Sequence, residues 1–355
     1  MRISDGAPSS REAFPTGKGC AMHIPENYLS PSTCGVFGAV MVPIWGFAIK
    51  KVRETVPREK MPLLGIAAAF CFLSMMFNIP IPGGSTGHAV CATLVAVLFG
   101  PWAATIAVSI ALIIQAVLFG DGGILALGAN CFNMAVVMPF VGYGVYSLVR
   151  GGSSDLKREL VAAGIGAYVG INCAALCAAL EFGIQPILFT DAAGAALYCP
   201  YPLSVSVPAM LVGHLAVWGP VEVIFTAGIL AFLRRTVPGF GLEDAATPSG
   251  RALAPAFALI AALVVLTPLG LIATGDAWGE WGAEDLADLV GYTPAGFEGW
   301  EWAAAMPDYS IGAMPEAVGY ILSAIIGVAL LVIAFRLFAF ASKPTADFDG
   351  PSSRA

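Results

Sequence analysis

The sequence predicts an all-α protein that crosses a membrane several times, and three observations lead to this prediction. Hydrophobic residues make up 58% of the chain and charged residues 12%, which is about half the charged share of a soluble domain. The mean hydropathy is +0.81. Apolar runs close to the length needed for a spanning helix recur along the whole chain, and basic residues gather in alternate connecting loops.

The apolar runs form a bundle of seven helices and a carboxyl-terminal hairpin of two more. The third run is short and ends at Gly100-Pro101, so its length alone leaves open that it is half of one kinked helix. Small residues at Gly166, Gly170 and Ala174 form a stripe on the sixth run, which permits close approach of a neighbouring helix. The nine predicted spans are residues 32–49, 61–79, 89–100, 102–119, 131–149, 159–182, 207–233, 252–273 and 317–338.

The distribution of Lys and Arg predicts nine spans, with the amino terminus outside and the carboxyl terminus cytoplasmic. The four outer loops, about residues 80–88, 120–130, 183–206 and 274–316, contain no Lys or Arg. Merging the third and fourth spans would place Arg150 outside, so the short third helix is expected to be separate. The inner loops and the tail hold the basic residues Lys50, Lys51, Arg53, Arg58, Lys60, Arg150, Lys157, Arg158, Arg234, Arg235, Arg251, Arg336, Lys343 and Arg354.

The chain divides into five parts. The first is polar and lacks the apolar core of a signal peptide, and its three basic residues lie on the wrong side for the predicted topology. We therefore expect a mis-annotated or removed leader, with Met22 as the initiator. The predicted parts are the leader (1–21), a seven-helix domain (22–240), a polar linker (241–250), a two-helix module (251–340) and a cytoplasmic tail (341–355).

Several functional classes are excluded by composition and motif. The net charge of −7 comes largely from one acidic loop and says nothing about nucleic acid, but the lack of a basic patch argues against nucleic acid as a partner. No phosphate-binding Walker A motif, catalytic triad or HExxH motif is present, so the chain is not expected to be an enzyme or to hydrolyse ATP. The eight cysteines lack CxxC spacing and are expected to be free thiols. The carboxylates of the acidic loop 274–316 either concentrate cations at the outer face or simply keep the loop solvated by water. The tryptophans of the same loop suggest anchoring at the membrane interface.

Two histidines near the outer face predict a metal site. The topology places Met22, His23 and His88 on one side of the membrane. The Met22 amine, the His23 amide nitrogen and the His23 imidazole can chelate one ion in fused rings, and His88 can supply a fourth nitrogen. Four nitrogens in a plane suit Ni(II) or Cu(II), and Co(II) is tolerated. The alternative for each histidine is a hydrogen-bonded core residue, and we favour that interpretation for His214.

Polar residues near these histidines are candidates for orienting the imidazoles from outside the ligand set. Asn130 is also a candidate cap for the fifth span. No resident cofactor is expected, because Ni(II) or Co(II) would be bound as the transported substrate. The candidates are Ser85, Thr86, Gln115, Asp121, Asn130 and Asn133.

Several motifs occur in the same order as in a known family. They are residues 22–25 (MHIP), 77–80 (FNIP), 82–88 (PGGSTGH), 119–123 (FGDGG) and 128–134 (GANCFNM). With these, residues 22–235 resemble the CbiM/NikM family, the metal-capturing membrane subunits of energy-coupling-factor cobalt and nickel transporters. The resemblance implies that Met22, His23 and His88 hold the metal. The carboxyl-terminal hairpin, with Met306-Pro307-Asp308-Tyr309, looks like a fused companion subunit of the CbiN/NikN type.

The resemblance also implies partners and a location. These are a transmembrane coupling subunit, cytoplasmic ATPase subunits and a bacterial plasma membrane. The metal would serve cobalamin biosynthesis or nickel enzymes, and the loop 82–88 is closer to the nickel branch. The competing hypotheses are a membrane-bound metal sensor or channel without an energised partner, and a metalloenzyme, which would need an open coordination position and a nearby base.

Overall fold

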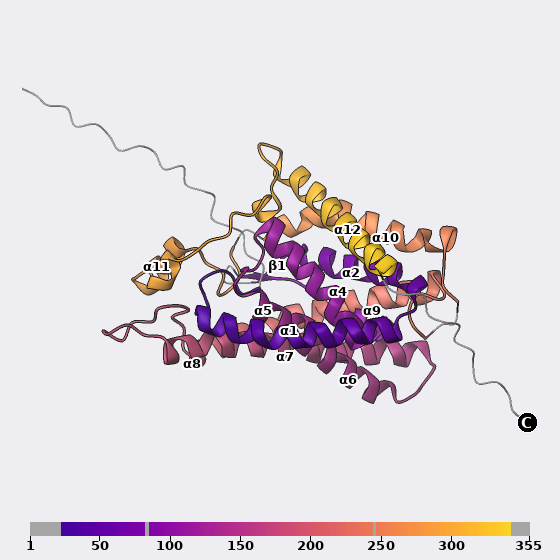
Figure 1. Ribbon diagram of the computed structural model, residues 1–355, viewed down its shortest axis with the longest axis horizontal. Helices are drawn as coiled ribbons and strands as arrows, with labels where there is room; N and C mark the ends of the chain where they lie inside the picture. Colours follow the sequence, from indigo (N-terminus) through magenta and orange to yellow (C-terminus); the bar gives the residue numbers. More distant parts are fainter. Residues whose placement is uncertain (1–22, 82–84, 244–245, 274, 342–355) are drawn as a thin grey trace, which may run out of the picture.

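The computed structural model describes residues 23–81, 85–243, 246–273 and 275–341. In these ranges the protein is a bundle of helices that run mostly along one axis, with one short two-stranded ribbon (Figure 1). The all-α membrane fold predicted from the sequence is therefore confirmed. Met22 and the predicted leader 1–21 lie outside the described residues, as does almost all of the predicted tail.

The helices correspond to the apolar runs of the sequence, with ends that differ from the prediction by a few residues. The ends differ because capping residues and local turns, rather than hydrophobicity, decide where a helix begins. The elements are α1 (Pro31–Thr55), α2 (Met61–Met75), β1 (Ile79–Pro80), β2 (Thr86–Gly87), α3 (Ala92–Phe99), α4 (Pro101–Ile114), α5 (Leu127–Asn130), α6 (Met138–Arg150), α7 (Leu156–Leu188), α8 (Leu203–Gly213), α9 (Gly219–Thr236), α10 (Ala254–Leu266), α11 (Ala283–Val290) and α12 (Glu316–Ala341).

Within the described ranges, seven helical stretches are long and apolar enough to cross a membrane. The predicted second and third spans correspond to α2 and α3, which have 15 and 8 residues and are almost wholly buried. Gly100, with φ +85°, separates α3 from α4. The nine-span count and the orientation in the membrane therefore stay predictions. The seven stretches are 31–55, 101–119, 127–150, 156–188, 203–236, 250–272 and 316–341.

In the part of the chain that the structure describes, three π-helical segments interrupt the long helices. Gln115–Phe119 ends the helix that begins with α4, Cys131–Val137 joins α5 to α6, and His214–Trp218 joins α8 to α9. The π-helix is rare in proteins as a whole. Where it does occur, it often lies at a functional site, because its wider turn displaces side chains from the regular helical spacing. Each segment holds a polar residue that the sequence singled out: Gln115, Asn133 or His214.

Close packing of α6 on α7 confirms the small-residue stripe. A Cβ atom added at Gly166 would lie 2.4 Å from the carbonyl oxygen of Gly142, and one at Gly170 would lie 2.7 Å from that of Met138. These contacts leave no room for a side chain. The two helices can therefore approach backbone to backbone only because the stripe consists of small residues.

The carboxyl-terminal hairpin packs on the bundle mainly through α12 and α2. A Cβ atom at Gly65 of α2 would lie 2.9 Å from Phe335, and one at Gly327 of α12 would lie 2.2 Å from Phe72. Two aromatic side chains thus fill spaces that glycines on the opposite helix leave open. The described cysteines are all free thiols, as the sequence predicts, and they are Cys34, Cys71, Cys91, Cys131, Cys173, Cys177 and Cys199.

The basic loops meet at one end of the molecule, on the right in Figure 1. Arg150, at the end of α6, makes a bidentate ion pair with Glu243. Arg234 pairs with Glu159 at 2.8 Å, and the Lys60 ammonium donates to the carbonyl of Gly241 at 2.6 Å. Loops that the charge pattern assigns to one side of the membrane are therefore in contact.

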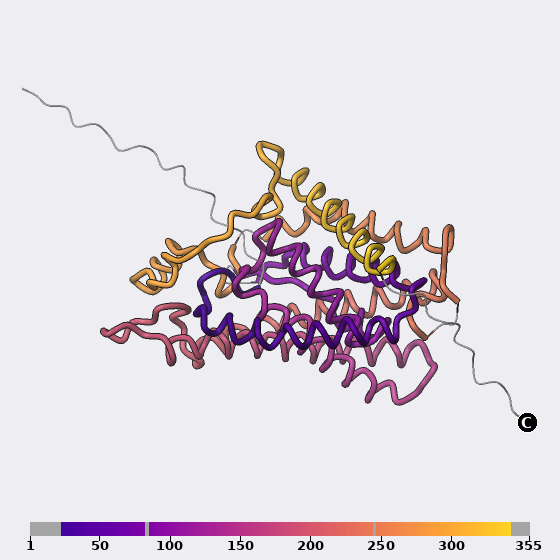
Figure 2. Tube along the Cα trace, viewed as in Figure 1, coloured from indigo at the N-terminus to yellow at the C-terminus, as the bar shows by residue number. Residues whose placement is uncertain are grey.

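The predicted outer loops meet at the opposite end (Figure 2), where the Gly296 N–H, in the stretch after α11, donates to the Leu197 carbonyl in the loop that follows α7 at 2.8 Å. The four tryptophans predicted to anchor the loop 274–316 at the interface have two kinds of surroundings. Trp278 and Trp281 pack against Tyr201, with ring centroids 5.3 and 5.8 Å from it. They are in contact with protein rather than standing free as anchors. Trp300 and Trp302 are 49% and 43% exposed.

Candidate metal centre

The first described residues, 23–30, form a leading segment that lies across the outer end of the bundle. The side-chain amide of Asn130 receives a hydrogen bond from the Ile24 N–H at 2.7 Å and donates to the Ile24 carbonyl at 3.0 Å. The N–H of Gly123 donates to the same carbonyl at 2.9 Å. Asn130 thus pairs with the segment as a neighbouring strand would.

The predicted role of Asn130 as a helix cap is wrong. The helix begins at Leu127, so Asn130 lies inside the helical stretch and has no orphan N–H group to cap. A helix-interior Asn is free to use both halves of its amide elsewhere. Here it uses them on the backbone of Ile24, 106 residues away in sequence.

Two further contacts fix the leading segment. The Glu26 carboxylate accepts hydrogen bonds from the N–H groups of Ile124 and Leu125 at 2.6 and 3.2 Å. Burial raises the pKa of Glu26 above its ordinary value, and these two N–H groups act in the opposite direction. The Ser30 N–H donates to the side chain of Gln185 at 3.0 Å. The position of His23 is therefore set by bonds along most of the segment that follows it.

His88 directly follows β2, and the ribbon of β1 and β2, in which Ile79 pairs with Gly87, fixes its position. The chain then turns into α3, and the buried carboxylate of Glu222 on α9 accepts hydrogen bonds from the N–H groups of Val90 and Cys91 at 2.7 and 3.0 Å. These are orphan donors at a helix start. Glu222 thereby fixes the backbone two and three residues beyond His88.

The structure brings His23 and His88 together. Their ring centroids lie 5.2 Å apart with planes inclined at 41°, and the residues are 2% and 0% exposed. With metal–nitrogen bonds of about 2.0–2.1 Å, two imidazoles on one ion have centroids about 4.5 to 6.5 Å apart. The observed separation fits a shared ion.

Both imidazoles have unused nitrogens. Nε2 of His23 and Nε2 of His88 are buried and have no hydrogen-bond partner among the described residues, whereas Nδ1 of His88 lies 3.1 Å from the carbonyl oxygen of Ala89. Burial and the neighbouring His23 lower the pKa of His88 well below its ordinary value. The neutral imidazole is the form that binds a metal. Buried polar atoms normally have a partner, so two adjacent imidazole nitrogens without one indicate a binding site.

Asp121 is the carboxylate nearest to the pair. Its Oδ1 lies 3.1 Å from Nδ1 of His23, although the two atoms are not aligned for a hydrogen bond. Its Oδ2 accepts hydrogen bonds from the Gln115 amide at 3.1 Å and from the Tyr309 hydroxyl at 2.5 Å. Both donors bind Oδ2, so Oδ1 is the carboxylate oxygen that lies next to the imidazole.

The chelate predicted from the sequence sets a condition on His23. A ring that contains its own amide nitrogen closes at six members only through Nδ1, the atom that faces Asp121 here. The amine of Met22 lies outside the described residues. No three His, Cys, Asp or Glu side chains gather into a metal site within the described ranges.

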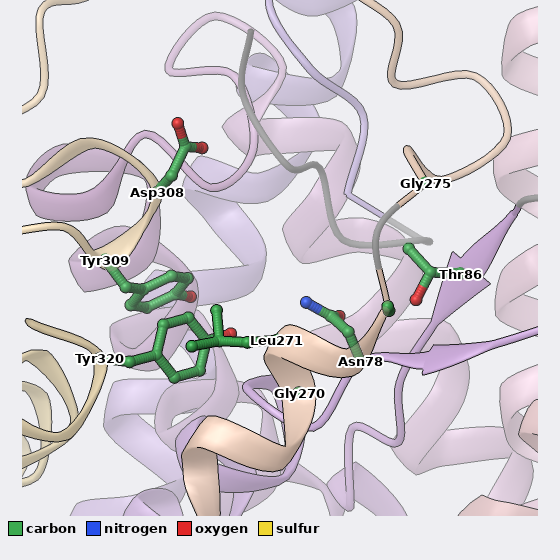
Figure 3. Close-up of a pocket in the computed structure, with 9 residues that line it drawn as sticks. Asn78, Thr86, Gly270, Leu271, Gly275, Asp308, Tyr309 and Tyr320 are labelled. Atoms are coloured by element: carbon green, nitrogen blue, oxygen red, sulfur yellow. The ribbon is translucent and has the colours of Figure 1, made fainter. Parts of the chain in front are cut away.

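The other predicted supporting residues, Ser85, Thr86 and Asn133, have no hydrogen bond to either histidine among the described contacts. Ser85 accepts a hydrogen bond from the N–H of Trp278 at 3.0 Å, and Asn133 donates to Glu181 at 2.8 Å. Thr86 lines a cavity of about 10 Å³ between the bundle and the hairpin, with Asn78, Tyr309 and Tyr320 among its walls (Figure 3). That volume suits a single water molecule.

His214 is a core histidine, as favoured from the sequence. Its Nδ1 lies 2.7 Å from the carbonyl oxygen of Met210, one turn back on its own helix. The ring packs edge-on against Trp218, with centroids 4.8 Å apart. Nothing places it in the ligand set.

Sequence reasoning missed Glu222, Glu181 and Tyr309. A signal for the first two was available, because an ionisable residue inside an apolar span marks a functional candidate, and both carboxylates are buried in spanning helices. Tyr309 lies 188 residues from Asp121 in sequence, and no local pattern predicts such a contact.

Comparison with known proteins gives an assignment for most of the chain. The family of the cobalt uptake substrate-specific transmembrane region (CbiM) matches residues 23–240, and the PDGLE domain matches residues 253–343. A "Probable fused nickel transport protein LarMN" of Lactiplantibacillus plantarum is 49% identical over 89% of this chain and 97% of its own length. The "Fused nickel transport protein NikMN" of Rhodobacter capsulatus is 49% identical over 90% and 97%.

A solved structure agrees with these relatives. The crystal structure of a transition metal transporter is 53% identical over 60% of this chain and 92% of its own, with a TM-score of 0.57. These proteins are named as transporters rather than enzymes. The chain therefore belongs to the CbiM family of metal-uptake membrane proteins and carries a PDGLE domain after it.

Proposed function

We propose that the chain is the substrate-capture subunit of an energy-coupling-factor transporter that imports Ni(II) or Co(II), with nickel favoured, across a bacterial plasma membrane. A transmembrane coupling subunit and cytoplasmic ATPases would supply the energy. The imported metal would serve nickel enzymes or cobalamin biosynthesis. The observation that carries the proposal is the pair of buried imidazoles, His23 and His88, whose Nε2 atoms have no partner among the described residues.

The chemistry of this pair supports a late divalent metal. Imidazole and backbone nitrogens favour nickel, copper, cobalt and zinc over magnesium or calcium, which prefer oxygen ligands. A dry surrounding strengthens the attraction between an ion and the nearby Asp121 carboxylate. The names of both fused relatives support nickel over cobalt.

Uptake in cells tests the coupled-transport part of the proposal. Cells that make the chain with its partner ATPases should accumulate nickel or cobalt, and cells that lack the ATPases should not. Equal accumulation in both would identify a channel. Metal binding without any transport in either would identify a sensor.

The amino terminus tests the ligand set. A chain that begins at Met22 with a free amine should bind Ni(II) more tightly than the same chain with that amine acetylated or extended by residues 1–21. The reason is that both changes convert the amine into an amide, which is a poorer ligand until it loses its proton. Equal affinity in the three forms would count against the amine as a ligand.

A further inference from the structure

The outer loop of the hairpin contains a stretch, residues 302–309, that docks onto the end of the helix carrying Gln115. We refer to it as the hairpin segment. The indole N–H of Trp302 donates to the carbonyl of Val117 at 2.9 Å, and the N–H of Met306 donates to that of Leu118 at 2.8 Å. The last carbonyls of a helix have no partner inside the helix. The hairpin segment therefore caps this helix, directly before Asp121.

The backbone of the hairpin segment is strained where it places Tyr309. Asp308 and Tyr309 have φ of +52° and +58°, in the left-handed region that residues with a Cβ atom seldom occupy. Such conformations persist only where the surroundings determine them. Here the Tyr309 ring stacks on Phe119, with centroids 4.5 Å apart and planes inclined at 20°, and the Tyr309 carbonyl accepts a hydrogen bond from Ser323 at 2.9 Å.

The Tyr309 hydroxyl is the group that this arrangement delivers to the candidate metal centre. It donates to Oδ2 of Asp121, and the Gln115 amide donates both to that oxygen and to the hydroxyl, at 3.1 and 3.0 Å. The three polar groups form a closed triangle, which fixes the plane of the carboxylate. Oδ1 then has one position, 3.1 Å from Nδ1 of His23.

We propose that Tyr309 is a positioning residue of the capture site: by holding Asp121, it sets the orientation of the His23 imidazole. The carboxyl-terminal hairpin then contributes to a site whose two histidines belong to the amino-terminal bundle. This inference rests on the proposed function. Outer partners of metal-ligating histidines affect affinity by about 10- to 100-fold, so a lost hydroxyl has a measurable effect.

The test separates orientation from packing, because Tyr309→Phe removes the hydroxyl and keeps the ring on Phe119. The control is Tyr292→Phe in the same outer loop, where the hydroxyl contacts only the backbone of Ala196 among the described residues. Ni(II) is titrated into the purified two-module chain, and the ligand-field absorption of the bound ion is recorded. We expect Tyr309→Phe to weaken binding by about tenfold and to change the absorption bands, and Tyr292→Phe to change neither.

Asp121→Asn and the double variant complete the experiment. If Tyr309 acts through Asp121, the double variant binds Ni(II) as weakly as Asp121→Asn alone, because residues in one network are not additive. Penalties that add in full, or wild-type affinity and spectrum in Tyr309→Phe, would overturn the inference. A wild-type chain that binds neither Ni(II) nor Co(II) would instead overturn the proposed function on which the inference depends.

Discussion

Two segments from opposite ends of the chain meet at the candidate metal centre, and each segment is held by different contacts. The backbone of the leading segment, residues 23–30, is hydrogen-bonded to Asn130 and Gly123. Its Glu26 side chain accepts hydrogen bonds from the N–H groups that directly follow Gly123. The hairpin segment, residues 302–309, reaches the site through one side chain on a strained backbone. In the proposed site, the first segment carries a ligand and the second positions it. Substitutions at the leading segment should therefore remove binding, and those at the hairpin segment should tune it.

The largest effect is expected at the ligands themselves. His23→Ala or His88→Ala should lower the Ni(II) affinity by more than about a hundredfold, since loss of an outer partner alone costs about 10- to 100-fold. Metal content of the purified variants, by elemental analysis, is the measurement. His214→Gln is the control, because that ring contacts Met210 and Trp218 and not the site. Unchanged nickel and cobalt in the two alanine variants would rule out the histidine pair.

The next effect is expected at the anchor of the leading segment. Asn130→Ala removes both hydrogen bonds to Ile24, and an unpaired buried N–H group costs about 1–3 kcal/mol. We expect a lower unfolding temperature in detergent and Ni(II) affinity reduced by about 10-fold or more, since His23 precedes Ile24 directly. Asn172→Ala is a matched control, because that amide donates to Tyr168 within its own helix. Wild-type affinity in Asn130→Ala would show that the segment is held without it.

A methyl group added under the same segment should have a smaller effect. A Cβ atom at Gly123 would lie 2.8 Å from the Glu26 nitrogen and 2.9 Å from the Pro25 carbonyl carbon. Overpacking of this kind costs about 1–3 kcal/mol. We expect Gly123→Ala to weaken Ni(II) binding less than Asn130→Ala does, because it leaves both hydrogen bonds between Asn130 and Ile24 in place.

Gly144→Ala is the control for this substitution. Nothing lies within 4 Å of a Cβ atom at Gly144, and replacing an open helical glycine by alanine stabilises a helix by about 0.5–1 kcal/mol. If both alanine variants bind Ni(II) equally well, the close contact of Gly123 with the leading segment does not hold His23 in place.

The parts of this site that sequence reasoning could predict are those with a local or compositional signal. The meeting of His23 and His88 at one end followed from the charge of the loops, and the helices followed from apolar length. The role of Asn130 was wrong because a helix start four residues earlier changed its surroundings. Tyr309 could not be predicted, because its position depends on how a hairpin packs on a distant helix, which no residue spacing records.

The smallest effect is expected at the opposite, basic end of the molecule, where Arg150 pairs with Glu243. The Glu243 side chain is 47% exposed, and exposed ion pairs contribute about 0–1 kcal/mol. Glu243→Gln should therefore change the unfolding temperature slightly and leave Ni(II) binding unchanged, since α6 ends at Arg150, at the opposite end of the molecule from the start of α1, which follows the leading segment (Figure 1). A loss of metal affinity here would show that the two ends are coupled.

The pH dependence of that small difference has a definite sign. The hydrogen bond from Arg150 lowers the pKa of the Glu243 carboxyl below its ordinary value of 4.5. A carboxyl whose pKa is lowered by folding contributes its stability above the unfolded pKa and loses it as the pH falls through the folded pKa. The wild type and Glu243→Gln should thus differ in unfolding temperature at neutral pH and converge below about pH 4. Thermal unfolding in detergent across that range measures the convergence, and a difference that grows toward acid would contradict the ion pair as its source.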